Sequence, residues 1–428
     1  MRVSEYWSNR ICGFFFGSRL SNTLPVFHYS NIPSSLEEKS HKSPNISYHT
    51  SMRVCVLMPF LDVYKGGNHL PLFRALPDVQ FTVLTSRVLP NGAPLPANVR
   101  VIELHERLGS YYYGFADWRF ARAVLRTYPV GHPFWKGFDV LHLNQVLGPQ
   151  FAVLPKTGVP VLYAIHHPVT ADREVAIAET SSCERILWRI KYFFPVRWQR
   201  HLCRSLPAVM TVSRTVQERL IRDYDIPPAK ISIVPNGVDG ERFQSAGDRT
   251  SDFDVIAVGS FLHPRKGFPY LLKVYAALAA QGIRIADAGK RSPAQRFRLE
   301  QLTGVTLFGT VSDKQITSLI QRSAVLLSTS LYEGFGLSLI EALACGRPAF
   351  AFDAGAVKEV LVPIDPSLVV PLRDSDALVR RVREFLSLSS EERRLRGERY
   401  REEVLKRYPL AASAAALRAM YTRLCRTF

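Results

Sequence analysis

The 428-residue sequence is poor in cysteine and contains no long apolar run. Its six cysteines are scattered and none forms a C-x-x-C pair, so neither a zinc site nor a disulfide framework is indicated. No stretch approaches the roughly eighteen consecutive apolar residues that a membrane-spanning helix needs. Internal repeats and low-complexity tracts are also absent. We therefore expect a cytoplasmic protein with reduced thiols and no transmembrane helix.

The composition is that of a globular protein with several domains. Hydrophobic residues make up 47% and charged residues 21% of the chain, which argues against an intrinsically disordered protein. The length allows two or three domains, each with a full core. The formal net charge of +18 predicts an anionic partner, and nucleotide-sugars, acidic lipid surfaces and nucleic acids all satisfy that condition.

Residues 1–51 differ from the rest of the chain. They are rich in serine and asparagine, contain Pro25, Pro33 and Pro44, and lack sustained helical or strand periodicity. We interpret them as a mostly disordered extension. Since Met52 directly precedes the first strand pattern, we expect the native start there, with a targeting segment as the alternative.

From Arg53 onward, apolar strand patterns alternate with helical patterns. The predicted strands of the first half include residues 54–58, 80–85, 139–143 and 159–165. This alternation is typical of an α/β protein with doubly wound parallel sheets. We place a first domain at residues 52–240 and a second at residues 252–407, joined by a polar linker.

The most informative stretch covers residues 328–348 and reads STSLYEGFGLSLIEALACGRP. It follows the apolar residues 324–327, a predicted buried strand, and it continues into a helical pattern that Gly346 and Pro348 stop. Between strand and helix, residues 333–336 form a turn with two glycines. Free amide groups at such a helix N-terminus favour phosphate, so the turn is a predicted phosphate site.

Two carboxylates, Glu333 and Glu341, bracket this turn and are eight residues apart. Most of that separation follows the predicted helix, which corresponds to about 12 Å at about 1.5 Å per residue. A carboxylate pair that hydrolyses one sugar needs a separation of about 5–9.5 Å. The spacing therefore favours contacts with the two ends of a long ligand, with a diphosphate between them. A nucleotide-sugar has that layout.

The same residues carry a family resemblance. Glu-x7-Glu, with Gly-Phe-Gly-Leu after the first glutamate and Ala-Leu-Ala-Cys-Gly-Arg-Pro after the second, resembles the donor-site motif of retaining GT-B glycosyltransferases of family 4. The resemblance covers residues 53–424 and implies two doubly wound, Rossmann-like domains that face a cleft. It implies an N-terminal domain for the acceptor and a C-terminal domain for the donor. It also implies that residues 408–428 return as a helix to the N-terminal domain.

The resemblance assigns roles around the turn. Glu333 is implied to contact the donor sugar, and Glu341 to bind the ribose of the nucleotide. The residues whose backbone amides are implied to face the donor phosphates are Gly334, Phe335, Gly336 and Leu337. The alternative is an ordinary strand–helix unit with surface glutamates.

Two further segments resemble donor-site loops. Lys266, followed by glycine, matches a diphosphate-binding lysine, whereas Ser260 stands where the family has an arginine. One missing charge-assisted contact is typically worth about 1.5–3 kcal/mol. We expect Arg265 either to replace that arginine or to form a surface salt bridge. Val311 lies in a loop that is implied to border the nucleotide base through its backbone.

The first half of the chain contains fewer residues that match the family's functional positions. Gly66 and Gly67 match a family pair that approaches the donor phosphates, and a plain tight turn is the alternative. His166 follows the predicted strand at residues 159–165, at the edge where open α/β sheets bind ligands. It matches the family's active-site histidine, with a packing role and the neighbouring His167 as alternatives.

Residues 184–204 form the clearest basic and aromatic segment. Six basic residues are interleaved with five aromatic ones, and we expect Pro195 to divide the segment into two helices. Such a segment either lies on an anionic membrane or is a domain helix with its aromatics in the core. We favour the domain helix. The membrane alternative places the protein peripherally at the inner face of the cell membrane.

We therefore expect a hexosyltransferase that uses a nucleotide-diphosphate sugar and retains the anomeric configuration, with His166 and Glu333 as catalytic residues. No metal or cofactor is expected, because Lys266 and the helix dipole already place positive charge at the diphosphate. Glycan, lipid-linked and small-molecule acceptors all remain open. The alternatives are a nucleic-acid-binding protein, for which we find no groove-binding element, and an inactive membrane-associated scaffold.

Overall fold

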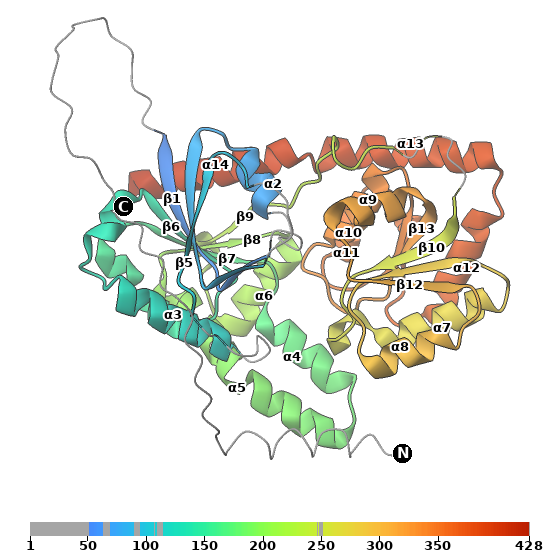
Figure 1. Ribbon diagram of the computed structural model, residues 1–428, viewed down its shortest axis with the longest axis horizontal. Helices are drawn as coiled ribbons and strands as arrows, with labels where there is room; N and C mark the ends of the chain where they lie inside the picture. Colours follow the sequence, from blue (N-terminus) through green and yellow to red (C-terminus); the bar gives the residue numbers. More distant parts are fainter. Residues whose placement is uncertain are drawn as a thin grey trace, which may run out of the picture. The chain divides into compact units, whose positions relative to one another are not determined.

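The structure is a computed structural model that describes residues 51–62, 69–89, 95–106, 108, 114–245, 247 and 251–427 (Figure 1). The predicted extension at residues 1–51 lies outside the described residues, except for Ser51. Gly66 and Gly67 also lie outside them, so their predicted contact with the donor phosphates stays a prediction.

The first half of the chain forms a seven-stranded parallel sheet in the order β5-β3-β1-β6-β7-β8-β9. Its strands are β1 (Met52–Leu57), β3 (Val79–Thr85), β5 (Val99–Glu103), β6 (Val140–Asn144), β7 (Val161–Ile165), β8 (Ala208–Thr211) and β9 (Ile231–Ile233). A separate parallel pair joins β2 (Phe60–Asp62) to β4 (Arg87–Leu89). Every residue of β6 and β7 is buried, as expected of central strands that are covered on both faces.

Helices cover this sheet on both faces. They are α2 (His69–Arg74), α3 (Phe115–Thr127), α4 (Val169–Ala178), α5 (Ser182–Ser205) and α6 (Arg214–Tyr224), with short 3₁₀ turns η3 (Pro133–Gly137), η4 (Pro149–Thr157) and η5 (Pro228–Lys230). Successive strand residues point to opposite faces, so Leu162 and Tyr163 of β7 enter two different cores. Tyr163 packs in a core with Phe120, and Leu162 in a core with Phe81.

Helix α5 continues through Pro195, so the prediction of two helices is wrong. Pro195 is buried and its ring lies against Gly114. This packing holds in place a proline that costs about 3 kcal/mol in a helix interior. The interpretation that the aromatics lie in the core is wrong for Phe193 and Phe194, because each is 46% exposed.

The second half forms a six-stranded parallel sheet in the order β12-β11-β10-β13-β14-β15. Its strands are β10 (Phe253–Val258), β11 (Ile285–Ala288), β12 (Val305–Gly309), β13 (Ser323–Ser328), β14 (Ala349–Phe352) and β15 (Val369–Val370). Its helices are α7 (Phe268–Ala279), α8 (Pro293–Glu300), α9 (Asp313–Gln321), α10 (Leu337–Ala344), α11 (Val357–Leu361) and α12 (Ser375–Leu386), with η6 (Pro264–Lys266) and η7 (Pro366–Leu368). Strands and helices share one core, which includes Val255, Leu326 and Ile340.

The last two helices connect the second half back to the first. Helix α13 (Ser390–Arg407) packs against α10, whereas α14 (Leu410–Thr427), red in Figure 1, packs on the first sheet. Tyr421 of α14 is fully buried, and its hydroxyl lies 2.6 Å from His142 Nδ1. Arg418 forms an ion pair with Asp78 at 2.7 Å. The predicted α/β fold of two doubly wound sheets with a returning C-terminal helix is confirmed, while the domain boundaries at residues 240 and 252 stay predictions.

Candidate active site

The turn between β13 and α10 lies against the end of β7. A Cβ on Gly334 would lie 1.9 Å from the backbone oxygen of His166, so only glycine fits at this close approach. The Ser213 hydroxyl donates a hydrogen bond to the Gly334 carbonyl at 2.8 Å. A backbone bridge between Glu333 and Gly355 fixes the turn from the other side. The structure thus brings the predicted donor turn and the predicted histidine together.

Glu333 contacts two cations of η6. Lys266 Nζ lies 2.5 Å from Glu333 Oε1, and Arg265 Nη1 lies 3.6 Å from Oε2. All three side chains are largely buried. Burial by itself raises the pKa of Glu333, but Lys266 and Arg265 outweigh it and lower the pKa to about 2. Glu333 is therefore a carboxylate throughout the physiological pH range.

The ionic contacts continue from Arg265 into the first half of the chain. Arg265 Nε lies 2.9 Å from Asp172 Oδ1 in α4, and Asp172 Oδ2 lies 3.1 Å from His167 Nε2. Burial raises the pKa of Asp172, but His167 and Arg265 hold it well below its usual range. Arg265 also donates to the Tyr332 carbonyl at 2.9 Å. Arg265 is thus part of a salt bridge, and that bridge is buried rather than at the surface.

Glu341 lies within α10 in a different electrostatic environment. Burial raises its pKa to about 7, while Arg242 lowers the pKa and Asp313 raises it. Arg242 and Asp313 form their own ion pair at 3.1 Å. A buried carboxylate is stabilised by hydrogen-bond donors, so Glu341 suits a ligand that presents hydroxyl groups.

His166 follows β7 and has a defined orientation. Its Nε2 lies 3.0 Å from Asn144 Oδ1, and its backbone N–H donates to Gln145 Oε1 at 2.6 Å. Gln145 Nε2 donates in turn to the His167 carbonyl at 3.0 Å. Burial lowers the pKa of His166 to about 4, so the imidazole is neutral at pH 7. Because Asn144 Oδ1 is an acceptor, the Nε2 nitrogen carries the proton.

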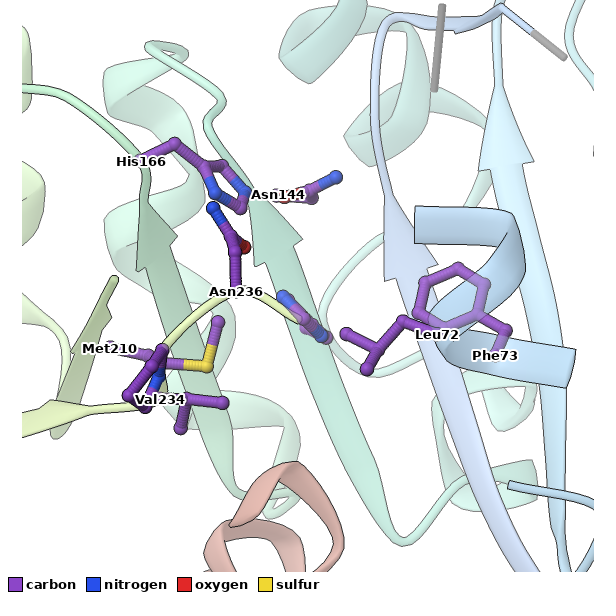
Figure 2. Close-up of a pocket in the computed structure, with 9 residues that line it drawn as sticks. Leu72, Phe73, Asn144, His166, Met210, Val234 and Asn236 are labelled. Atoms are coloured by element: carbon purple, nitrogen blue, oxygen red, sulfur yellow. Dashed lines mark hydrogen bonds between the residues drawn. The ribbon is translucent and has the colours of Figure 1, made fainter. Parts of the chain in front are cut away.

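His166 lines a pocket of about 10 Å³, close to the space that one water molecule needs (Figure 2). The side chains of Asn144 and Asn236 are directed toward His166 (Figure 2). Apolar walls are contributed by Leu72, Phe73, Met210 and Val234. Polar groups at one corner of an apolar pocket can orient a hydroxyl group.

The remaining predicted donor residues lie around the same turn or after β12. Gly336 is the N-cap residue of α10, with a φ of 95°, and Leu337 begins the helix. Phe335 is buried in the second core and its ring lies 5.4 Å from that of Tyr408. Val311 follows β12 and packs at the edge of the same core. Their backbone contacts with a donor stay predictions.

A second arginine lies beside the serine that replaces the expected arginine at position 260. Arg291 follows β11, and its Nη1 donates to the Gly259 carbonyl at 2.6 Å. Its Nη2 lies 2.6 Å from Asp287 Oδ2, and its guanidinium lies over the Phe261 ring. Sequence reasoning missed Arg291 because it comes from a different strand, and the only signal was two basic residues after a strand-ending glycine.

Sequence reasoning also missed other contacts between the two halves near this site. The Tyr192 hydroxyl lies 2.6 Å from His263 Nε2. Glu359 accepts hydrogen bonds from the backbone N–H groups of Arg214 and Thr215 at 2.8 and 2.9 Å, which caps the start of α6. Each of these pairs joins residues far apart in the chain, so no local motif could have indicated them.

Three Asp-x-Asp pairs occur in the chain, and protein groups engage all of them. The pair at residues 223 and 225 lies at the end of α6, where Asp223 binds Arg219 and Arg222 and Asp225 binds Arg204. The pair at residues 252 and 254 begins β10 and binds Arg322 and Arg284. The pair at residues 374 and 376 caps α12 and binds Lys273. Over the described ranges, no group of three or more His, Cys, Asp or Glu side chains could hold a metal ion.

Two family models match the chain. Residues 252–387 match the model described as glycosyl transferases group 1, and residues 74–242 match glycosyltransferase family 4. The MMP alpha-(1->4)-mannosyltransferase of Mycolicibacterium hassiacum is 32% identical over 386 residues, which cover 86% of this chain and 92% of that protein. The D-inositol 3-phosphate glycosyltransferase of Mycolicibacterium paratuberculosis is 27% identical over 332 residues, or 72% of this chain and 70% of that protein.

Solved structures share the fold. Sucrose-phosphate synthase from Thermosynechococcus elongatus aligns with 88% of this chain and 100% of its own, with a TM-score of 0.69 and 19% identity. WaaG, a glycosyltransferase involved in lipopolysaccharide biosynthesis, aligns with 82% of this chain and 95% of its own, with a TM-score of 0.61 and 16% identity. Anabaena Alr3699/HepE in complex with UDP and glucose covers 87% of this chain and 99% of its own, with a TM-score of 0.61 and 16% identity.

Fold and sequence together define a GT-B glycosyltransferase that uses a nucleotide-sugar donor. The chain belongs to glycosyltransferase family 4 and is a hexosyltransferase, which confirms the predicted family and enzyme class. None of the helices that the structure describes has the length and apolar character to span a membrane.

Proposed function

We propose that the enzyme transfers a hexose, with mannose as the first candidate, to a sugar hydroxyl and retains the anomeric configuration. The observation that carries the proposal is the meeting of Lys266, Arg265 and Glu333 at a turn whose Gly334 touches His166. Mannose is suggested by the mannosyltransferase that is 32% identical over most of both chains. The UDP complexes of the Anabaena neighbour support a nucleoside diphosphate as the leaving group.

When the donor binds, Lys266 exchanges its ion pair with Glu333 for a contact with the donor diphosphate. Without a ligand, the Lys266 ammonium is bonded to Glu333 at 2.5 Å. A donor diphosphate competes for that ammonium, because phosphate oxygens are strong acceptors of charge-assisted hydrogen bonds. Glu333 is then free to accept hydrogen bonds from the hydroxyls of the sugar. Glu341 accepts hydrogen bonds from the ribose hydroxyls at the other end of the donor.

Charge on the departing nucleoside diphosphate is stabilised from two sides. Lys266 supplies a full positive charge. The turn amides from Gly334 to Leu337 supply hydrogen-bond donors at the start of α10, where the helix dipole favours an anion. In this proposal the transfer needs no metal ion, because these groups already neutralise the charge that develops.

Weak basicity of the protein groups supports retention. The pKa values of Glu333, about 2, and His166, about 4, make both groups poor bases at pH 7. A released phosphate, with a second pKa of about 6, is a better proton acceptor. The acceptor oxygen bonds to the anomeric carbon on the face that the phosphate leaves, and the acceptor proton passes to the phosphate oxygen. Neutral His166 orients a hydroxyl through a hydrogen bond.

A donor panel tests the proposal. The full chain is incubated with GDP-mannose, UDP-glucose and ADP-glucose and with simple α-mannosides, and release of nucleoside diphosphate is measured. We expect one donor to be turned over strongly and the product to keep an α linkage by NMR. Turnover of none of the donors by folded protein contradicts the transferase proposal, and a β-linked product contradicts retention alone.

The same protein is tested for the alternative functions. Binding of RNA or DNA that falls steeply with salt, together with no donor turnover, favours the nucleic-acid-binding alternative. Binding of a nucleotide-sugar in calorimetry without any turnover favours the inactive scaffold.

A further inference from the structure

Helix α5 carries a strong positive charge. Its 24 residues include six basic side chains and one acidic side chain, a net charge of +5. The single acid, Glu184, caps the helix by accepting hydrogen bonds from the backbone N–H and the hydroxyl of Ser181 at 3.2 and 3.0 Å. Arg185, Arg189, Arg197 and Arg200 are all exposed. No acidic side chain of the helix offsets these four charges.

Exposed apolar side chains lie between these cations. They are Ile186, Leu187, Ile190, Phe193 and Phe194, with exposures of 60%, 54%, 66%, 46% and 46%. Spacings of three, four and seven residues place them on one face of the helix, which we term the apolar face of α5. Phe115 of α3 is 49% exposed and extends this face, with its ring 6.1 Å from that of Phe194.

The rest of α5 is firmly packed. The Tyr192 hydroxyl lies 2.6 Å from His263 Nε2, and the Trp188 ring lies 5.4 Å from the His263 ring. Further along, Gln199 and Leu202 are fully buried. The apolar face therefore belongs to a helix that tertiary contacts hold in position. Large exposed apolar faces on such helices mark interaction surfaces.

We propose that the apolar face of α5 docks on the surface of an anionic membrane. The positive charge argues against a second copy of this chain as the partner. A second copy has the same net charge of +18 and the same basic helix, so the two surfaces would repel each other. An anionic bilayer neutralises the arginines while its acyl boundary takes up the apolar side chains. Arg197, whose guanidinium lies 3.6 Å from the centre of the Phe193 ring, combines both kinds of contact. Attachment through this face does not depend on the donor chemistry.

Vesicle co-sedimentation of the full chain tests the proposal. One set of vesicles is pure phosphatidylcholine, and the other contains about one-third phosphatidylglycerol, a share at which basic surfaces are attracted. We expect binding to the anionic vesicles only, weakened by salt. The double variant Ile190→Glu/Phe193→Glu is expected to lower the bound fraction at least tenfold, and Arg189→Glu/Arg197→Glu to lower it similarly.

Phe297→Glu is the matched control. Phe297 of α8 is 65% exposed, so the change has the same chemistry at a similar exposure outside the apolar face, and binding should not change. Because all substituted residues are exposed, the variants should keep the far-UV circular dichroism of the parent. Quenching of tryptophan fluorescence by brominated lipid, lost in the double variant, gives a second measure of contact, because Trp188 and Trp198 lie on α5.

Four results would overturn the proposal, and the fourth concerns residues 1–51. The first is no binding of the parent protein to anionic vesicles. The second is equal vesicle binding by the parent and by Ile190→Glu/Phe193→Glu. The third is a shift of the double variant from dimer to monomer in light scattering with unchanged vesicle binding, which assigns the face to a second copy. If a variant that lacks residues 1–51 binds vesicles as the parent does, the proposal stands; loss of binding in that variant assigns attachment to those residues and contradicts it.

Discussion

The donor turn and the surroundings of His166 are built in different ways. At the turn, Glu333, Gly334 and Gly336 come from four consecutive residues of the segment 329–336, which connects β13 to α10. Around His166, the polar contacts come from Asn144 at the end of β6 and from the residue that follows it. A site made from one local segment leaves a motif in the sequence, whereas a site assembled from neighbouring strands leaves scattered single residues.

The two glutamates of the motif show a second contrast. The pKa of Glu333 is lowered to about 2 by Lys266 and Arg265 against the effect of burial, whereas burial raises the pKa of Glu341 to about 7. When the environments of two carboxyl groups shift their pKa values in opposite directions, the two groups can take different roles. Glu333 is a permanent anion beside the cations that we assign to the diphosphate, and Glu341 changes its charge near neutral pH.

The largest expected effect is that of Lys266→Ala. Removing the ammonium takes away the full charge that the donor turn offers to the leaving diphosphate, so kcat should fall by about 10²–10³-fold. Steady-state release of nucleoside diphosphate from the best donor measures it. Lys273→Ala is the control, because Lys273 is exposed and its pair with Asp376 lies at the surface. Equal losses in both variants would contradict the role of Lys266.

Gly334→Ala should have the next largest effect. A Cβ there would lie 1.9 Å from the His166 carbonyl, so the turn and the end of β7 must move apart. Misplacement of this kind can lower kcat by about 10²-fold, and overpacking can lower the free energy of unfolding by about 1–3 kcal/mol. Gly137→Ala is the control, since no atom lies within 4 Å of the added Cβ. A fully active Gly334→Ala variant would show that the two regions need not touch.

The sequence predicted the fold because the strands of both sheets are short apolar runs bounded by turns, as in β7 and β13. It predicted the donor turn because Glu333 and the two glycines are neighbours. It could not predict the ion pair between Arg265 and Asp172, because the two residues are 93 positions apart and only the packed halves bring them together. The prediction of a helix break at Pro195 was wrong for the same reason. Tertiary packing against Gly114 outweighs the low helix propensity of proline, and the local sequence does not show that contact.

A smaller effect is expected on the pH dependence of donor affinity, to which Glu341 should contribute and Glu333 should not. If ionised Glu341 accepts the ribose hydroxyls, donor affinity should fall as pH drops through its pKa of about 7, because the protonated carboxyl loses acceptor capacity. Between pH 7.5 and 6 the loss should be about tenfold, measured by calorimetry with an intact nucleotide-sugar. Glu341→Gln should bind weakly at both pH values and lose this dependence. The pKa of Glu333, about 2, keeps it ionised throughout, so an unchanged pH profile in Glu341→Gln would reassign the titrating group.

The smallest expected effect concerns Asn144, which orients His166 through the 3.0 Å contact with Nε2. Asn144→Ala should lower kcat about fivefold, which corresponds to the roughly 1 kcal/mol net value of one neutral hydrogen bond. Donor affinity should stay unchanged, because the proposed donor contacts come from the turn.

Asn144→Asp distinguishes orientation from charge. The carboxylate keeps the hydrogen bond but favours the imidazolium, so it raises the pKa of His166 above about 4. If the neutral imidazole is the working form, the acid limb of the kcat profile moves to higher pH in Asn144→Asp while kcat on the plateau stays near that of the parent. An equal loss at every pH would instead mean that Asn144 contacts the acceptor itself, and the pocket of Figure 2 would then belong to acceptor binding rather than to the positioning of His166.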